Sequence, residues 1–177
     1  DDAAVLTVVG ARQVVTTDHL RAFTEDPWTL ARIAANHALG DIWAMGAEPQ
    51  AALAQVVLPY MAAPLQEATL REVMAAAAEV FREAGAEVVG GHSTQGAEMT
   101  LGFTVTGLCA RPPILLSGAR PGDALILTKP IGSGTVLAGE MALKATGDEV
   151  LATLEAMQHS QGAAARILSG AHAMTDV

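Results

Sequence analysis

Aromatic and basic residues are both scarce in this 177-residue chain: aromatics make up 3% of it, and 10 Lys and Arg stand against 19 Asp and Glu. The net charge of −9, with His neutral, argues against a nucleic-acid partner, because an acidic surface repels the phosphate backbone. The sequence has no uninterrupted run of ~20 apolar residues, so no membrane span is predicted. No signal peptide is visible either, and the expected location is cytoplasmic.

Cysteine is nearly absent as well, since Cys109 is the only one. A single cysteine excludes an intrachain disulfide framework and a Cys-rich zinc site. It ends an apolar, strand-like run, so we interpret it as a small buried hydrophobic side chain. The sequence also has no HExxH and no GxSxG pattern, which leaves zinc hydrolases and serine hydrolases of those types without support.

The residues that are abundant are apolar and small: the chain is 51% hydrophobic and 16% charged, which is typical of a compact α/β or α+β protein. Local patterns predict the order β-β-α-β-α-β-β for the first 110 residues. The predicted elements are a hairpin of 3–10 and 12–18 around Gly10 and Ala11, a helix from Asp26 and Pro27 to Gly46, a strand at 49–59, a helix at 64–85, a short strand and turn at 87–93, and a strand at 99–110.

A segment rich in Pro and Gly at 110–122 predicts a domain boundary, with an N-terminal domain at 1–110 and the first part of a C-terminal domain at 111–177. The second part is predicted to contain a strand at 124–130 and two or three helices over 134–171. We expect an α+β fold in which helices cover one face of a mostly antiparallel sheet. The other face is expected to pack against a second copy. Both ends look cut from a longer polypeptide.

Four aspartates stand at the ends of apolar elements or inside a helix, where an unpaired carboxylate is costly. They are Asp2, Asp18, Asp41 and Asp176. If they converge, they can hold Mg²⁺ against a polyphosphate, because Mg²⁺ takes carboxylate and phosphate oxygens. The alternative is that each is an ordinary turn or cap residue, and the sequence pattern alone does not decide between the two. His37 precedes Asp41 by four residues and therefore shares its helix face.

Two glycine-containing segments are weaker candidates for anion binding. Gly90 and Gly91 begin GGHS, where the backbone can approach a ligand closely, although a plain tight turn explains the same residues. The segment matches neither the Walker pattern nor GxGxxG. Lys129 in LTKPIGSG either meets a phosphate or is a solvated lysine at a strand end.

Taken in order and spacing, several motifs resemble the selenophosphate synthetases (selenide, water dikinases). These motifs are DDAAV, TTDHL, DPWTLARIAANHALGDIWAMGAEP, AGAEVVGGHSTQGAE, GFTVTG, GDALILTKPIGSG and AMTDV. That family belongs to the superfamily of aminoimidazole ribonucleotide synthase and thiamine-monophosphate kinase. The resemblance implies the N-terminal domain fold of that superfamily, a dimeric barrel, followed by the start of an α/β C-terminal domain.

The resemblance also implies an activity: ATP, selenide and water would give selenophosphate, AMP and phosphate. Asp2, Asp41 and Asp176 would bind Mg²⁺, and Asp18 would lie beside the ATP phosphates. Asp41 would thereby also belong to the ATP site. Further ATP contacts would come from Gly91, His92 and Ser93 of the partner subunit in a homodimer.

Two departures from the family pattern keep other functions open. The family's catalytic Cys or selenocysteine lies in a loop before DDAAV, so the resemblance assigns no catalytic residue to this chain and leaves the activity of the segment by itself in question. His37 stands where the family usually has Asn, which we interpret as a neighbour that orients Asp41. The alternatives are another ATP-dependent small-molecule kinase or ligase of the superfamily, or a non-catalytic nucleotide-binding dimerisation module.

Overall fold

The computed structural model describes residues 2–177, and Asp1, the first residue of DDAAV, lies outside the described residues. Five strands and two long helices precede a region of short helices. In chain order the elements are β1 (Ala4–Val8), β2 (Ala11–Arg21), α1 (Pro27–Ala44), β3 (Glu48–Pro59), α2 (Ala63–Glu83), β4 (Glu87–Gly96), β5 (Thr100–Cys109), the 3₁₀ turn η1 (Leu116–Gly118), α3 (Ser133–Met141), α4 (Gly147–Met157) and α5 (Gly162–Ile167).

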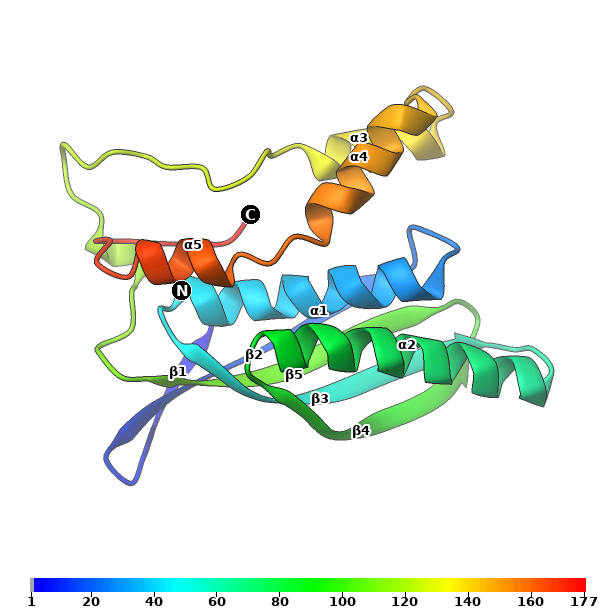
Figure 1. Ribbon diagram of the computed structural model, residues 1–177, viewed down its shortest axis with the longest axis horizontal. Coiled ribbons are helices and arrows are strands. Elements are labelled where there is room, and N and C mark those ends of the chain that lie inside the picture. The colour runs from blue at the N-terminus through cyan, green and yellow to red at the C-terminus, as the bar shows by residue number, and fades with distance from the viewer. Residues whose placement is uncertain (1) are drawn as a thin grey trace.

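The strands form one sheet in the order β1-β2-β5-β3-β4. All neighbouring pairs are antiparallel except β3 and β4, which are parallel because α2 connects them as a crossover. Helices α1 and α2 lie side by side on one face of this sheet (Figure 1). The predicted α+β class, with helices on one face of a mostly antiparallel sheet, is confirmed.

The first two strands form the predicted hairpin, but its turn lies one residue earlier than expected. Val8 pairs with Ala11, so the turn residues are Val9 and Gly10 rather than Gly10 and Ala11. Both turn residues have positive φ, 46° and 82°. A two-residue turn with this twist matches the twist of the strands it joins. Strand β2 also continues past Asp18 to Arg21, so Asp18 lies within the strand.

The hydrophobic core lies between the sheet and its two long helices. Phe81 of α2 and Phe103 of β5 meet edge to face at its centre, with ring centroids 5.0 Å apart. Helix α1 begins where predicted, because the Asp26 side chain accepts a hydrogen bond from the Thr29 N–H at 3.1 Å. The helix lies close against the sheet at Gly107, where a Cβ atom would stand 2.6 Å from Ile42 Cγ2. This close packing fixes the helix that carries Asp41.

The residues after β5 form three helices, as predicted, but the strand predicted at 124–130 is absent from the described structure. The side chains of Leu125 and Leu127 are 101% and 67% exposed, and a strand does not form without a neighbour to pair with. Helices α4 and α5 reach back to α1. In one of these contacts, Asn36 Nδ2 donates to the Gln158 carbonyl oxygen at 3.0 Å. Within residues 2–177, no helix combines the length and apolarity required to cross a membrane.

Candidate metal and nucleotide site

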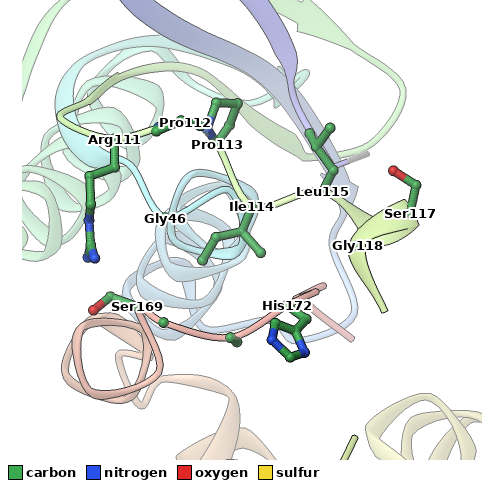
Figure 2. Close-up of a pocket in the computed structure, with 12 residues that line it drawn as sticks. Gly46, Arg111, Pro112, Pro113, Ile114, Leu115, Ser117, Gly118, Ser169 and His172 are labelled. Atoms are coloured by element: carbon green, nitrogen blue, oxygen red, sulfur yellow. The ribbon is translucent and has the colours of Figure 1, made fainter. Parts of the chain in front are cut away.

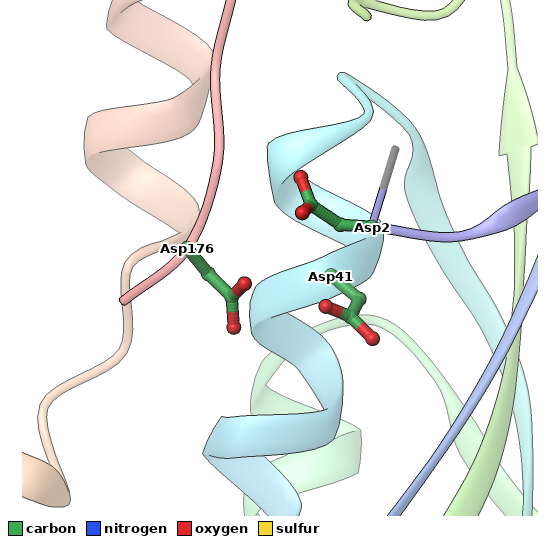
Figure 3. A group of neighbouring side chains, drawn as sticks. All are labelled: Asp2, Asp41 and Asp176. Atoms are coloured by element: carbon green, nitrogen blue, oxygen red, sulfur yellow. The ribbon is translucent and has the colours of Figure 1, made fainter. Parts of the chain in front are cut away.

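Three of the four aspartates singled out in the sequence meet at one point. Asp2 precedes β1, Asp41 lies on α1, and Asp176 lies in the C-terminal segment, which runs beside α1 (Figure 3). One carboxylate oxygen of each lies within 4.8 Å of those of the other two, and all three residues are half-buried. The structure therefore brings together oxygen ligands from segments far apart in the sequence. We refer to these three residues as the aspartate centre.

Neighbouring residues hold the aspartate centre in place. Thr175 Oγ1 donates to Asp2 Oδ1 at 3.0 Å and so ties the two ends of the described chain together. On α1, Gly40 leaves the space that Asp176 occupies, because a Cβ atom there would stand 2.8 Å from Asp176 Oδ2. Thr16 of β2 donates a hydrogen bond from its hydroxyl to Asp41 Oδ2.

Sequence reasoning missed Thr16, although the signal was available. Side chains alternate along a strand, so Thr16 and Asp18 lie on the same face of β2. That face carries the buried Val14 and is covered by α1. A hydroxyl two residues before a candidate aspartate, on the same buried face, could have been selected as its neighbour.

Asp18 lies against the aspartate centre as the fourth carboxylate. Its Oδ2 atom is buried and has no hydrogen-bond partner, and the same holds for Asp2 Oδ2. Its other oxygen, Oδ1, is 3.9 Å from His37 Nε2. The ionic neighbour of His37 is therefore Asp18. Our interpretation that His37 orients Asp41 is wrong in this respect, because Thr16 is the residue that holds Asp41.

The crowding of carboxylates changes their acidity. Burial is the main reason that the pKa of Asp41 is raised to about 7; the charges of Asp18 and Asp176 also contribute, and the hydrogen bond from Thr16 opposes the shift. Burial also raises the pKa of Asp176, which the charges of Asp2 and Asp18 increase and His37 opposes. A divalent cation would relieve both effects. Buried carboxylate oxygens without donors and an all-oxygen ligand set fit Mg²⁺.

The GGHS segment does not reach the aspartate centre within one chain. It lies inside β4, so the turn predicted there is wrong, and Gly91, His92 and Ser93 are all exposed. Strand pairing places Asp18, Phe103, Ala54 and Gly91 in one row across β2, β5, β3 and β4. Three strand spacings separate the ends of this row by roughly 14 Å.

Gly91 has a structural reason to be glycine. A Cβ atom there would stand 2.1 Å from the carbonyl oxygen of Ala54 on β3, at a φ of 152°. At Gly90, by contrast, the nearest atom to an added Cβ is Leu53 Cδ2 at 3.4 Å, an ordinary contact. Only the second glycine of the pair is thus required by the neighbouring strand.

A cavity of about 430 Å³ lies beyond the end of α1 (Figure 2). It is enclosed by Gly46, by the loop at 111–118 and by the segment at 169–172. None of the four aspartates lines it. Cys109, at the end of β5, is partly rather than fully buried, and burial raises the pKa of its thiol. The thiol is therefore poorly suited to serve as a nucleophile.

The family model described as AIR synthase related protein, N-terminal domain, matches residues 1–109. The selenide, water dikinase of Geobacter metallireducens is 38% identical over 182 residues, covering 100% of this chain and 52% of that protein. The selenide, water dikinase of Nitratidesulfovibrio vulgaris (strain Miyazaki F) is 43% identical over 137 residues, covering 76% of this chain and 38% of that protein. The chain spans about half, or less, of the length of these curated relatives.

Solved structures share the fold. Thiamine monophosphate kinase from Aquifex aeolicus has a TM-score of 0.82 at 18% identity, over 99% of this chain and 62% of that chain. AaThiL complexed with AMPPCP and TMP has a TM-score of 0.76 at 18% identity, over 96% of this chain and 56% of that chain. At these identities the likeness establishes a common fold alone.

Proposed function

Because this chain belongs to the family of AIR synthase related proteins, we propose that it carries the Mg²⁺ and ATP site of a selenide, water dikinase. Such an enzyme uses ATP, selenide and water to form selenophosphate, AMP and phosphate. The observation that carries the proposal is the meeting of Asp2, Asp41 and Asp176 within 4.8 Å. An ATP analogue in the structure of AaThiL, which has the same fold, supports nucleotide binding.

In this proposal each residue of the site has a defined task. The carboxylates of Asp2, Asp41 and Asp176 hold Mg²⁺, whose contribution is to neutralise the charge of the ATP phosphates. Thr16 fixes the orientation of Asp41, and Asp18 lies beside Asp41, where the resemblance places the ATP phosphates. In this proposal the aspartates hold a cation against the ATP phosphates and form no covalent bond to them, so their contribution to catalysis is electrostatic.

Thr16→Val tests the orientation of Asp41. Valine has nearly the same shape as threonine but cannot donate a hydrogen bond, so the Asp41 carboxylate loses its fixed rotamer. We expect Mg²⁺ affinity to fall about 10- to 100-fold in a calorimetric titration. The matched control is Thr17→Val, because Thr17 lies on the opposite face of β2 and its hydroxyl accepts from Thr104 at 3.0 Å. Equal Mg²⁺ affinity of the two variants would contradict the assigned role of Thr16.

The roughly 14 Å between Asp18 and Gly91 favours a homodimer, in which a second copy supplies its own GGHS segment to the site. The sheet face opposite the helices is the surface proposed to pair. It carries threonines, glutamines and exposed apolar side chains such as Leu53, which is 45% exposed. This arrangement matches the dimeric barrel that the resemblance implies, and it would cover the face that helices leave open in Figure 1.

Leu53→Arg tests this surface. Arginine in the middle of β3 would place a charge in the proposed interface, so sedimentation velocity at micromolar concentration should change from dimer to monomer. Leu151→Arg is the matched control, because Leu151 is 67% exposed on α4, away from the sheet. If the wild-type protein sediments as a folded monomer, the dimer proposal fails.

A second candidate function is another ATP-dependent small-molecule kinase or ligase of the superfamily, because the motifs DDAAV and TTD also resemble other members of that superfamily. The two candidates differ in their products. Selenide-dependent release of AMP from ATP by the full-length protein is expected for the dikinase, whereas formation of ADP with a phosphorylated acceptor would favour the kinase. Binding of MgATP without turnover of any acceptor would instead favour a nucleotide-binding module.

A further inference from the structure

We propose that His172 is a positioning residue for the aspartate centre: through its contact with Asp123, it holds the C-terminal segment in the place from which Asp176 reaches the other two ligands. The inference rests on the proposed function, since it takes Asp176 to be a ligand of Mg²⁺. It goes further by assigning a role at the metal site to two residues, His172 and Asp123, that are not themselves among the ligands.

The C-terminal segment, residues 169–177, has few attachments of its own. It contains no helix or strand, and none of its described residues after Ala171 takes part in a backbone–backbone hydrogen bond. Asp41, by contrast, lies within the regular hydrogen bonding of α1. The position of Asp176 therefore depends on side-chain contacts of this segment. One of them, from Thr175 to Asp2, lies inside the aspartate centre itself.

His172 provides an attachment outside the centre. Its Nδ1 atom lies 2.8 Å from Asp123 Oδ1. The other oxygen of Asp123 accepts a hydrogen bond from the Arg120 N–H at 2.8 Å, so a tight turn already orients the carboxylate. The hydrogen bond from Arg120, and after it the one from His172, lower the pKa of Asp123. The carboxyl group is thus ionised at neutral pH, and Nδ1 of the histidine is the donor.

The connection between β5 and α3 also supports the backbone of His172. At Gly118 in η1, an added Cβ atom would stand 1.9 Å from the His172 carbonyl oxygen, and both residues line the cavity in Figure 2. The same connection is tied to α1, because the Ile114 N–H donates to the Met45 carbonyl oxygen at 3.0 Å. Met45 follows Asp41 by four residues. The connection therefore joins the helix that carries one ligand to the segment that carries another.

The effect of the contact is expected at the metal site rather than on the fold. The side chains of His172 and Asp123 are 44% and 31% exposed, and a pair so exposed adds little to the stability of a protein. Asp176 follows His172 by four residues, which reach about 14 Å when extended, so Asp176 cannot move far while His172 is held. Without the contact, Mg²⁺ must order the segment as it binds, and this cost lowers its affinity.

Calorimetric titration of the full-length protein with Mg²⁺ tests the inference. His172→Leu removes the donor, and the Mg²⁺ affinity is expected to fall about 3- to 10-fold. His172→Asn should retain the wild-type affinity, because an asparagine amide nitrogen can donate from nearly the position of Nδ1. The matched control is His159→Leu, which should also bind as the wild-type protein does. His159 is an exposed histidine whose Nδ1 contacts the nearby Glu155 carbonyl oxygen at 3.0 Å.

A double-mutant cycle separates positioning from a general loss of stability. Asp123→Ala is expected to lower Mg²⁺ affinity as His172→Leu does. The double variant should lower it no further, since both substitutions break the same contact. The Tm measured without Mg²⁺ should fall by less than about 3 °C in each variant, because the pair is exposed.

The outcomes distinguish this inference from the proposed function. If His172→Leu binds Mg²⁺ as tightly as the wild-type protein, if His172→Asn is weakened equally, or if the losses in the cycle add, the role of His172 is refuted while the aspartate centre stands. If the wild-type protein does not bind Mg²⁺, the proposed metal site is refuted and the inference with it. Should circular dichroism show that His172→Leu is unfolded, the other two variants decide: Asp123→Ala must weaken Mg²⁺ binding and His172→Asn must not.

Discussion

Asp41→Asn is expected to abolish binding of Mg²⁺ and MgATP and, at the same time, to stabilise the metal-free protein. The carboxylate lies among other carboxylates, and its burial raises its pKa to about 7. An ionised Asp41 without a cation is therefore unfavourable in the folded state. Asparagine keeps the shape and an oxygen that can accept from Thr16, but it removes the charge. Loss of function and gain of stability in one variant is typical of a site built to bind a cation.

The sign of the pH dependence follows from the direction of the shift. In the unfolded chain Asp41 titrates near its ordinary value of 3.8, whereas in the folded protein it keeps its proton until about pH 7. The folded state binds more protons between these values, so the free energy of unfolding decreases as pH rises from about 4 to about 7. Asparagine does not titrate. The free energy of unfolding of Asp41→Asn is therefore expected to exceed that of the wild-type protein at pH 8, and the difference should vanish near pH 4.

The measurement is thermal unfolding in the presence of a chelator at pH 8 and at pH 4. Because Asp41 is only half-buried, solvent screening reduces the expected gain to about 1 kcal/mol, or an increase in Tm of about 2–4 °C at pH 8. Asp148→Asn removes the same charge from an exposed position on α4 and is the control. If Asp41→Asn binds Mg²⁺ as the wild-type protein does, Asp41 is not a metal ligand.

Local sequence signals were sufficient for most of the fold. Asp26 and Pro27 marked the start of α1, and the glycines Gly46 and Gly85 marked the ends of the two long helices. These predictions succeeded because caps and glycine exits depend on residues close in sequence. The aspartate centre is a different case. Asp2 and Asp176 lie at opposite ends of the chain, and only the packing of the C-terminal segment on α1 brings them together. The sequence identifies these residues by their unfavourable positions and by the resemblance. It does not give the distances between them, because those distances depend on the tertiary structure.

Two predictions failed where a neighbouring strand decides the outcome. The segment 124–130 has the composition of a strand, but no described strand lies beside it, so it remains unpaired. The pair Gly90 and Gly91 has the composition of a turn, yet β3 pairs with it and keeps it extended. Strand propensity depends on context in this way, because it reflects packing against neighbours more than a preference of the backbone.

Gly91→Ala is expected to cause the larger loss of stability of the two glycine substitutions in GGHS, because the new methyl group would overlap the backbone of β3. An added Cβ would stand 2.1 Å from the Ala54 carbonyl oxygen and 2.8 Å from its nitrogen, and neither atom can move without breaking the pairing of β3 with β4. We expect a loss of about 2–4 kcal/mol, measured as a decrease in Tm of about 5–15 °C. Relative to the wild-type protein, the rate of amide hydrogen exchange should increase more along β4 than along β2.

Gly90→Ala is the matched control for this substitution, because its added methyl group would meet only Leu53 Cδ2 at 3.4 Å. A change of less than about 3 °C in Tm is expected for it. The comparison also separates two explanations for Gly91, namely close approach of an ATP molecule and close approach of β3. If Gly91→Ala melts at the wild-type temperature and loses only MgATP affinity, the glycine is required by the nucleotide. If Gly91→Ala unfolds at a lower temperature than the wild-type protein in the absence of nucleotide, the sheet requires the glycine. Any contact of this residue with ATP then depends on the position of β4 in the sheet.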